Sequence, residues 1–497
     1  MARGAGLDLL PEMMEAGARR LLAPLRTALR ASALYRQLLK GPLADHLAFQ
    51  PHDPGQGRLE DADALLRGRF RFHGQSLEVP AGVSIFELPP PSREWSEALH
   101  AFAWLPPLAL AGGEAARTLT TNLIAQWVRR HARYTEPPWS AHVMARRLLH
   151  LFSHGRHAIA NSEMTWRSKL FVSLREQSRM LERIAAEAPE GLPRLEAAAA
   201  LALSGLCLEP APARLAAGLR RLEEECQRQI LPDGGHVSRS PEALLDAYRL
   251  LTMVWDGLIA ARIEPPHDLR NARDRIAPML RFFRHGDGGL FLFHGGLESQ
   301  PHMIASLLAR DEVRGQPFQH ARHSGYQRLA AGKSIVVVDC GKLPEGAFSG
   351  KAHAGFLAFE FSSGTCRLVV NCGAGGEAGW DEALRATAAH STLTLADKSA
   401  ASVLPPGLAR DLLGPRLTGG PLEPLSRRSE TPAGWTVDAS HDAYVADFGM
   451  VHERKVSLSS QGTTLTGADR LVPVDANASL KLPFALRFHI HPDVRVS

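Results

Sequence analysis

The spacing of apolar residues divides the chain into two halves with different periods. From residue 95 to residue 308, apolar side chains recur every three or four positions, which predicts amphipathic helices. The expected helices cover 116–128, 143–152, 166–186, 194–206, 213–230, 241–263 and 271–283, with proline or glycine breaks between them. Consecutive helix pairs of this kind close into an α/α toroid or stack as a solenoid, and no fixed-period repeat favours the solenoid.

After about Gln319 the period changes to two, which is typical of β-strands with one buried face. Strands are predicted at 334–339, 356–362, 366–372, 391–395, 435–440, 455–458 and 484–490. The tetrapeptides at 362–365 and 460–463 predict hairpin turns, so we expect an antiparallel β-sandwich. The last predicted strand lies close to Ser497, which leaves open that this C-terminal domain is truncated.

The first 92 residues predict a helical lead followed by a small mixed segment with a hairpin near residues 70–79. Leucines and arginines alternate through residues 1–41 with helical spacing, and a helix that packs on the protein is favoured over a peripheral membrane helix. No apolar core with a small-residue cleavage site marks a signal peptide. No run of 18 apolar residues predicts an integral membrane segment.

Length and composition indicate a globular protein of several domains. The chain has 497 residues, of which 45% are hydrophobic and 22% charged, so it divides into more than one core. We expect an α+β multidomain protein with a lead at 1–92, a helical domain at 93–315 and a β-domain at 316–497. A net charge of +5 over this length, without a basic stripe interleaved with aromatic residues, predicts no nucleic-acid partner. Five scattered cysteines predict neither a disulfide framework nor a CxxC zinc site.

Three short phrases place histidines beside small residues at the edges of predicted elements. They are DGGHVSRSP at 233–241, KAHAG at 351–355 and AAHST at 388–392. An imidazole in such a position can face a space between two domains instead of a core. Because the first phrase belongs to the helical half and the others to the strand half, the sequence predicts a site where the halves meet.

In their order and spacing, these phrases resemble the heparinase II/III family of polysaccharide lyases. The pair Pro-Trp at 138–139, the pair Arg-Arg at 146–147 and the phrase HSGYQRL at 323–329 complete the resemblance, which covers residues 95–497. It implies an N-terminal incomplete α/α toroid followed by an antiparallel β-sandwich, with a cleft between them. It also implies that the protein is a lyase that cleaves a uronate-containing acidic polysaccharide or oligosaccharide by β-elimination.

β-Elimination at a uronic acid requires three kinds of group. A base removes the C5 proton, a polar or cationic group neutralises the neighbouring carboxylate, and an acid protonates the departing glycosidic oxygen. We assign Tyr326 or His353 to proton transfer, and Arg239 or His236 to the carboxylate. The residues expected to bind substrate are Trp139, Arg146, Lys351 and Asn371.

The chain departs from the family pattern at several of these positions. Members often carry His-Ala-His-Ala-Asp, whereas Lys351 and Gly355 replace the first histidine and the aspartate here. Some members hold zinc with two histidines and an aspartate. In this chain His353 and His390 supply imidazoles, but Asn371 lies where the carboxylate is expected, and a neutral amide is a poor zinc ligand. We therefore expect no cofactor, or at most weak or structural zinc.

Three functions remain open on the sequence. The leading hypothesis is a polysaccharide lyase, and the alternative is a catalytically weakened glycan-binding or cell-envelope assembly protein. A glycoside hydrolase comes third, because no convincing pair of carboxylates is visible. The resemblance predicts a cell-envelope or periplasmic location, and the absence of a visible signal peptide makes the cytoplasm the alternative.

Overall fold

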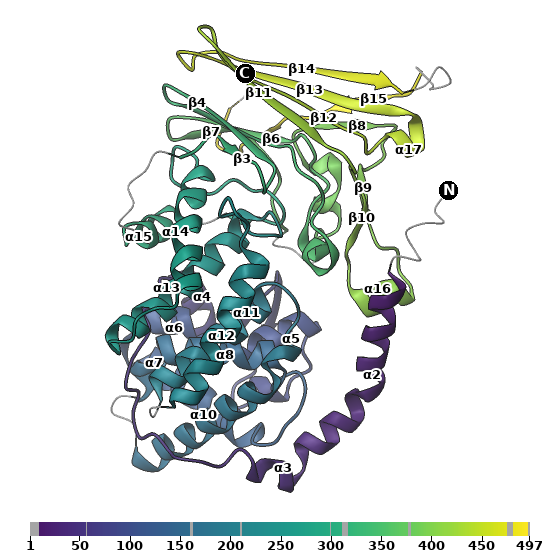
Figure 1. Ribbon diagram of the computed structural model, residues 1–497. Coiled ribbons are helices and arrows are strands. Elements are labelled where there is room, and N and C mark those ends of the chain that lie inside the picture. The colour runs from purple at the N-terminus through teal and green to yellow at the C-terminus, as the bar shows by residue number, and fades with distance from the viewer. Residues whose placement is uncertain are drawn as a thin grey trace.

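The computed structural model describes residues 9–55, 57–159, 163–208, 211–298, 300–310, 317–375, 379–474 and 481–495. Helices form the first part of the chain, and antiparallel strands form the second part and lie above them in Figure 1. This confirms the expected α+β organisation, an incomplete α/α toroid followed by a β-sandwich. The boundary predicted at residue 315 lies outside the described residues.

The helical part is organised around α11, which contacts α8, α12 and α13. Small residues allow this close packing: a Cβ atom on Gly218 of α12 would lie 2.4 Å from the backbone nitrogen of Ala202 in α11. The Oγ atom of Ser240 caps α13 by accepting the N–H of Ala243 at 3.3 Å. The helices are α4 Leu59–Leu66, α5 Arg93–His100, α6 Leu105–Ala111, α7 Gly113–Arg130, α8 Ala141–His154, α9 Arg156–Ile159, α10 Met164–Ile184, α11 Leu192–Cys207, α12 Pro212–Gln229, α13 Pro241–Ala260, α14 His267–Phe282 and α15 Pro301–Leu308.

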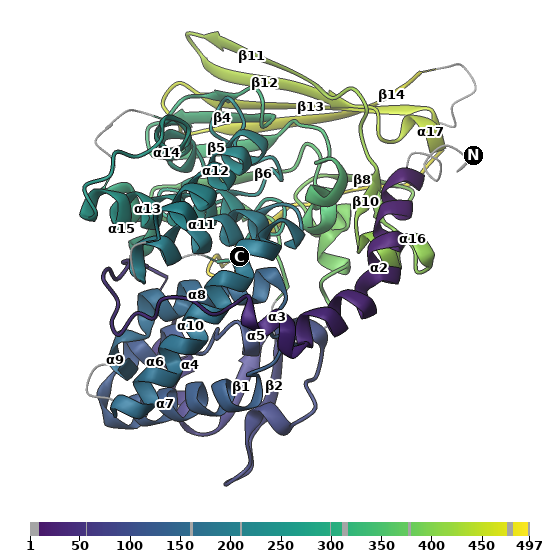
Figure 2. The same ribbon diagram turned by 60° about the horizontal axis from the view of Figure 1, so that its bottom comes forward.

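The N-terminal helix α2 (Leu10–Ala31) runs beside the molecule from α3 (Ala33–Gln37) to α16 (Leu408–Leu413), as Figures 1 and 2 show. It contacts the rest of the protein through its charged side: Glu12 pairs with Arg416 and Arg30 pairs with Glu187. None of its residues is buried, and the side chain of Leu21 is 83% exposed. Among the described residues, no helix is both long and apolar enough to cross a membrane.

A small β-hairpin is attached to the helical half. The predicted hairpin is present as β1 (Arg69–Phe72) and β2 (Gln75–Glu78), which pair antiparallel. Phe72 at its tip contacts Trp95 of α5, with ring centroids 5.3 Å apart. The hairpin is therefore joined to the helices by aromatic packing.

The β part contains two main antiparallel sheets. One has six strands in the order β16-β7-β6-β5-β4-β3, and the other has four in the order β11-β12-β13-β14. Buried apolar residues pack between them, among them Leu329, Val336 and Val338 from the first sheet and Val437 and Val456 from the second. The strands are β3 His320–Ala321, β4 Tyr326–Ala331, β5 Ser334–Asp339, β6 Phe359–Ser363, β7 Cys366–Val370, β8 Leu393–Leu395, β9 Ala401–Val403, β10 Leu417–Gly419, β11 Leu425–Thr431, β12 Gly434–His441, β13 Met450–Ser459, β14 Leu465–Pro473, β15 Phe484–Leu486 and β16 His489–Ile490.

Polar contacts join the helical part to the β part. The carboxylate of Asp233 accepts the backbone N–H groups of His323 and Ser324 at 2.8 and 2.7 Å. The Nε2 atom of His285 lies 3.0 Å from the carboxylate of Glu360, and both side chains are fully buried. Because burying a polar group without its partner is costly, the contact between His285 and Glu360 in particular fixes the position of one part on the other.

Candidate functional site

Arg239 lies in the loop before α13, and its guanidinium group is buried between the two parts. Its Nε atom donates to the carbonyl of Ser324 at 2.8 Å, its Nη1 donates to the carbonyl of Lys342 at 2.8 Å, and its Nη2 pairs with Asp339. Burial alone would raise the pKa of Asp339, but Arg239 and a hydrogen bond from His294 outweigh it and lower that pKa to about 2. The guanidinium group is thus bound to groups of the protein itself.

Tyr326 lies directly against Arg239 in the same buried region. Its hydroxyl donates to the backbone carbonyl of Arg239 at 2.7 Å, and its ring lies 4.7 Å from the guanidinium carbon. The rings of Phe283 and Phe293 pack on it at 4.9 and 5.2 Å. Burial raises the pKa of Tyr326 well above its ordinary value. In this conformation the hydroxyl is a buried hydrogen-bond donor.

His236, on the turn that ends the DGGH phrase, is also buried. Its Nδ1 accepts the backbone N–H of Ser238 at 3.1 Å, so its Nε2 carries the proton of the neutral ring and donates to Gln229 at 3.0 Å. Burial lowers the pKa of His236 to about 4. Both ring nitrogens are therefore occupied: Nδ1 within the turn, and Nε2 in holding the turn to α12.

His353 and His390 are direct neighbours, as the sequence predicted. The Nδ1 atom of His390 donates to the carbonyl of Ala386 at 2.9 Å, so its Nε2 accepts a proton from Nδ1 of His353 at 3.1 Å. The backbone N–H of His353 donates to His294, whose Nε2 in turn donates to Asp339 at 3.0 Å. Burial lowers the pKa of both His353 and His390, the latter to about 4. The contacts that run from His390 to His353, and from the backbone N–H of His353 to His294, end at the carboxylate that Arg239 also binds.

The residues around the two imidazoles do not provide a complete zinc site. The amide of Asn371 donates to Glu360 at 2.9 Å and accepts the N–H of Ser391 at 3.0 Å, so it is engaged elsewhere. Within the described part of the chain, no group of three histidine, cysteine or acidic side chains has the arrangement of a metal site. Two imidazoles bonded to each other, without a carboxylate, do not fit the ligand set of zinc.

Gly355 explains how the two imidazoles come so close. A Cβ atom at this position would lie 2.6 Å from Cδ2 and 2.9 Å from Cγ of His390. The aspartate that family members often carry here would therefore collide with the ring of His390. The glycine at position 355, which departs from the family pattern, therefore leaves the space in which His390 contacts His353.

The residues expected to bind substrate lie in different environments. Trp139 is only 2% exposed, and its Nε1 donates to the carbonyl of His131 at 2.9 Å, so it belongs to the helical core. The Nε of Arg146 in α8 donates to Glu196 in α11 at 2.7 Å, and 40% of its side chain is exposed. Lys351 ends the short 3-10 helix η3 (Gly346–Lys351) and is exposed. Of these three, only the two cations are available to a ligand in solution.

Two carboxylates near these cations were not predicted from the sequence. Glu242 and Asp246 lie one turn apart at the start of α13, and the charge of Lys351 acts on both. Burial, together with the charge of Asp246, raises the pKa of Glu242 to about 7, while its oxygen accepts the N–H of Leu297 at 2.6 Å. Acidic residues are common at helix starts because they face the positive end of the helix dipole. The positions of Glu242 and Asp246 in the sequence therefore did not indicate a functional site.

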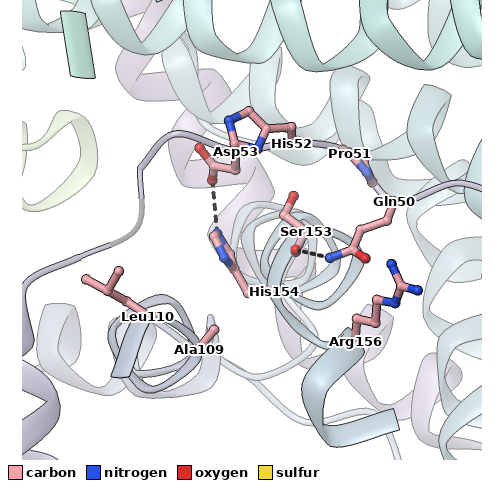
Figure 3. Close-up of a pocket in the computed structure, with 9 residues that line it drawn as sticks. All are labelled: Gln50, Pro51, His52, Asp53, Ala109, Leu110, Ser153, His154 and Arg156. Carbon is pink, nitrogen blue, oxygen red and sulfur yellow. Dashed lines mark hydrogen bonds and ion pairs between the residues drawn. The ribbon is translucent and has the colours of Figure 1, made fainter. Parts of the chain in front are cut away.

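A cavity of about 520 Å³ opens on the helical part, beside α8 (Figure 3). On one side Asp53 accepts hydrogen bonds from Arg249 at 2.9 and 3.0 Å and lies 3.4 Å from Nε2 of His154. Arg249 holds the pKa of Asp53 well below its ordinary value, against the opposing effect of burial. The cavity is lined by Gln50, Pro51, His52, Asp53, Ala109, Leu110, Ser153, His154 and Arg156, none of which the sequence predicted as functional.

Comparison with known proteins gives the family. Residues 313–497 match the family described as heparinase II/III-like, C-terminal. The crystal structure of heparinase III is similar with a TM-score of 0.62 and 16% identity, covering 95% of this chain and 78% of that one. The chain belongs to the heparinase II/III family. A mutant of the heparan sulfate lyase HepC from Pedobacter heparinus has a TM-score of 0.55 and 16% identity, covering 93% of this chain and 77% of that one.

A relative with higher sequence identity has a name that does not mention lyase activity. FtsZ-localized protein C of Caulobacter vibrioides is 34% identical over 476 residues, which are 94% of this chain and 81% of the relative. The 16% likeness to heparinase III and HepC shows the fold alone. The heparinase II/III fold supports a lyase-like or glycan-binding role.

Proposed function

We propose that this protein uses the heparinase II/III fold to bind a partner and does not cleave glycans by elimination. We also propose that it localises with FtsZ. The proposal is related to the alternative hypothesis, a catalytically weakened glycan-binding or cell-envelope assembly protein, and adds localisation with FtsZ to it. The proposal implies a cytoplasmic location, in which the protein can reach FtsZ, instead of the expected periplasmic one.

The buried state of the groups required for elimination is the observation that carries this proposal. The guanidinium of Arg239 is bound to Asp339, the hydroxyl of Tyr326 to a backbone carbonyl, and the nitrogens of His236 to Gln229 and Ser238. None of these three groups is more than 6% exposed. To act on a sugar, each would have to break hydrogen bonds inside the protein, at a cost of about 1–3 kcal/mol per unsatisfied group.

The similarities support the same reading. FtsZ-localized protein C is 34% identical and matches nearly the whole chain, whereas the lyase structures are 16% identical. Two of the residues that separate this chain from the lyase pattern have a local structural reason or a partner here: Gly355 leaves room for the ring of His390, and Asn371 donates to Glu360. A role shared with the first protein therefore requires fewer changes than a role shared with the lyases.

Cosedimentation with FtsZ polymers tests this function. The purified full chain should appear in the pellet with polymerised FtsZ and stay in the supernatant without it. Heparinase III is the matched control, because it has the same fold at 16% identity and should stay in the supernatant under both conditions. Failure of the full, folded chain to sediment with FtsZ above the level of heparinase III would contradict the proposal.

A second candidate, a uronate lyase with a different set of groups, is favoured by one specific observation. Arg146 and Lys351 supply exposed positive charges, and Glu242, with a pKa near 7, is suited to proton transfer near neutral pH. Appearance of an unsaturated uronate product that Glu242→Gln abolishes would favour this candidate.

A further inference from the structure

Cys372 and His489 form a contact pair on the β part that the proposed function does not use. The Sγ atom of Cys372 lies 3.6 Å from Nδ1 of His489. Cys372 is exposed and His489 is half-buried. Strand register produces the contact, because Val370 at the end of β7 lies opposite His489 on β16 and Cys372 follows two residues later.

Hydrogen bonds fix the orientation and the tautomer of His489. Its Nε2 lies 3.0 Å from the carbonyl oxygen of Ala388. A carbonyl can only accept, so Nε2 carries the proton of the neutral ring and Nδ1 offers a lone pair to the thiol. The backbone N–H of Cys372 donates to the carbonyl of Ala389 at 3.1 Å. The same short turn therefore positions both members of the pair.

This arrangement is that of a nucleophile, a base and a group that orients the base. We propose that Cys372 is a modification site, a thiol activated by His489 for exchange with low-molecular-weight disulfides. The pair is made by residues at the end of β7 and on β16, so the inference does not depend on glycan binding or on FtsZ.

The exchange needs no oxidant beyond the disulfide itself. The sulfur of Cys372 attacks one sulfur of the reagent, and the reagent's S–S bond breaks as the new S–S bond forms. The thiol proton passes to Nδ1 of His489, and the departing thiolate then takes up a proton. The products are one mixed disulfide on the protein and one free small thiol.

The base is needed because the thiol does not ionise readily by itself. Partial burial and the carboxylate of Glu360 raise the pKa of Cys372. Only the deprotonated sulfur is a good nucleophile, so the rate of exchange depends on proton transfer to His489. Replacement of His489 by a residue that cannot accept this proton should therefore slow the reaction.

The other four cysteines supply internal controls. Cys366 is also exposed, at the start of β7, and among the described residues its sulfur forms no hydrogen bond to a histidine. Cys207, Cys226 and Cys340 are buried, and burial raises the pKa of each of these thiols. Selective reaction at Cys372 over Cys366 isolates the effect of His489 from the effect of exposure.

The experiment treats the reduced full chain with glutathione disulfide at neutral pH and measures adducts at each cysteine by peptide mass spectrometry over time. We expect Cys372 to react about tenfold faster than Cys366, and His489→Gln to remove this advantage while Cys366 is unchanged. Glutamine can still donate to Ala388 but is no base. Melting curves compare the fold of the variant with wild type.

The direction of the effect separates proton transfer from a structural role. If His489 only covered the thiol or held β16 in place, its replacement would expose Cys372 and raise its rate. Equal rates at Cys372 and Cys366 in wild type would overturn the proposal. A rate at Cys372 that is unchanged or raised in His489→Gln would also overturn it.

Discussion

Replacement of Arg239 by methionine should destabilise the protein strongly, because it leaves a buried carboxylate without its cation. Asp339 is 1% exposed, and its remaining partners would be Nε2 of His294 at 3.0 Å and the N–H of Gly341 at 3.1 Å. Loss of one member of a buried ion pair costs about 3–5 kcal/mol. For a domain of this size that corresponds to a fall in Tm of roughly 6–20 °C.

Thermal unfolding followed by circular dichroism measures this loss, with Arg146→Met as the matched control. Arg146 is also an arginine paired with a carboxylate, but its side chain is 40% exposed, so its removal should cost less than about 1 kcal/mol. The double variant Arg239→Met with Asp339→Leu removes both charges and should recover a large part of the lost Tm.

The outcome also bears on the role of Arg239 in binding. If Arg239→Met melts within the range of Arg146→Met, the guanidinium is not required inside the protein. It would then be free to neutralise a substrate carboxylate, and the structural role argued above would be refuted. A large fall in Tm that the double variant does not reverse would refute the part of the reasoning that rests on the unpaired charge.

Three further predictions follow from single groups. The pKa of Glu242 in the folded protein is about 7, above its ordinary value of 4.5, so the stability that this group contributes is lost as the pH rises from 4.5 through 7. The variant Glu242→Gln cannot ionise, so its Tm should fall less than that of wild type between about pH 5 and about pH 8. Gly355→Ala should cost about 1–3 kcal/mol, because its Cβ would lie 2.6 Å from His390, whereas Gly350→Ala, with nothing within 4 Å, should cost little in the same melting assay. Elemental analysis of protein purified without chelator should find no zinc or only substoichiometric zinc, and one tightly held zinc per chain would contradict the pairing of His353 with His390.

The helical and strand periods were enough to predict the two-part fold. The expected helix at 194–206 corresponds to α11, and the expected turns at 362–365 and 460–463 correspond to the β6–β7 and β13–β14 hairpins. The strand β11 was not predicted. Its sequence, LSRRSET, is polar and largely exposed at the edge of the four-stranded sheet, so it has no apolar alternation to detect.

The candidate site was less accessible from the sequence than the fold. The two histidine phrases indicated that His353 and His390 could supply imidazoles to one site, and in the structure the two rings lie side by side. The ion pair between Arg239 and Asp339 was not predicted. The two residues are 100 positions apart, and no hydrophobic pattern in the sequence connects them. A charged residue in a loop is ordinarily solvated, and only the folded chain shows that this one is buried.

The absorbance of unsaturated uronates gives the most direct test of binding without cleavage. The purified, folded chain is incubated with a panel of acidic glycans, and heparinase III on its own substrate serves as the positive control. We predict no increase in absorbance with any glycan in the panel, even where the protein binds the glycan. A steady increase that scales with protein concentration would contradict the account.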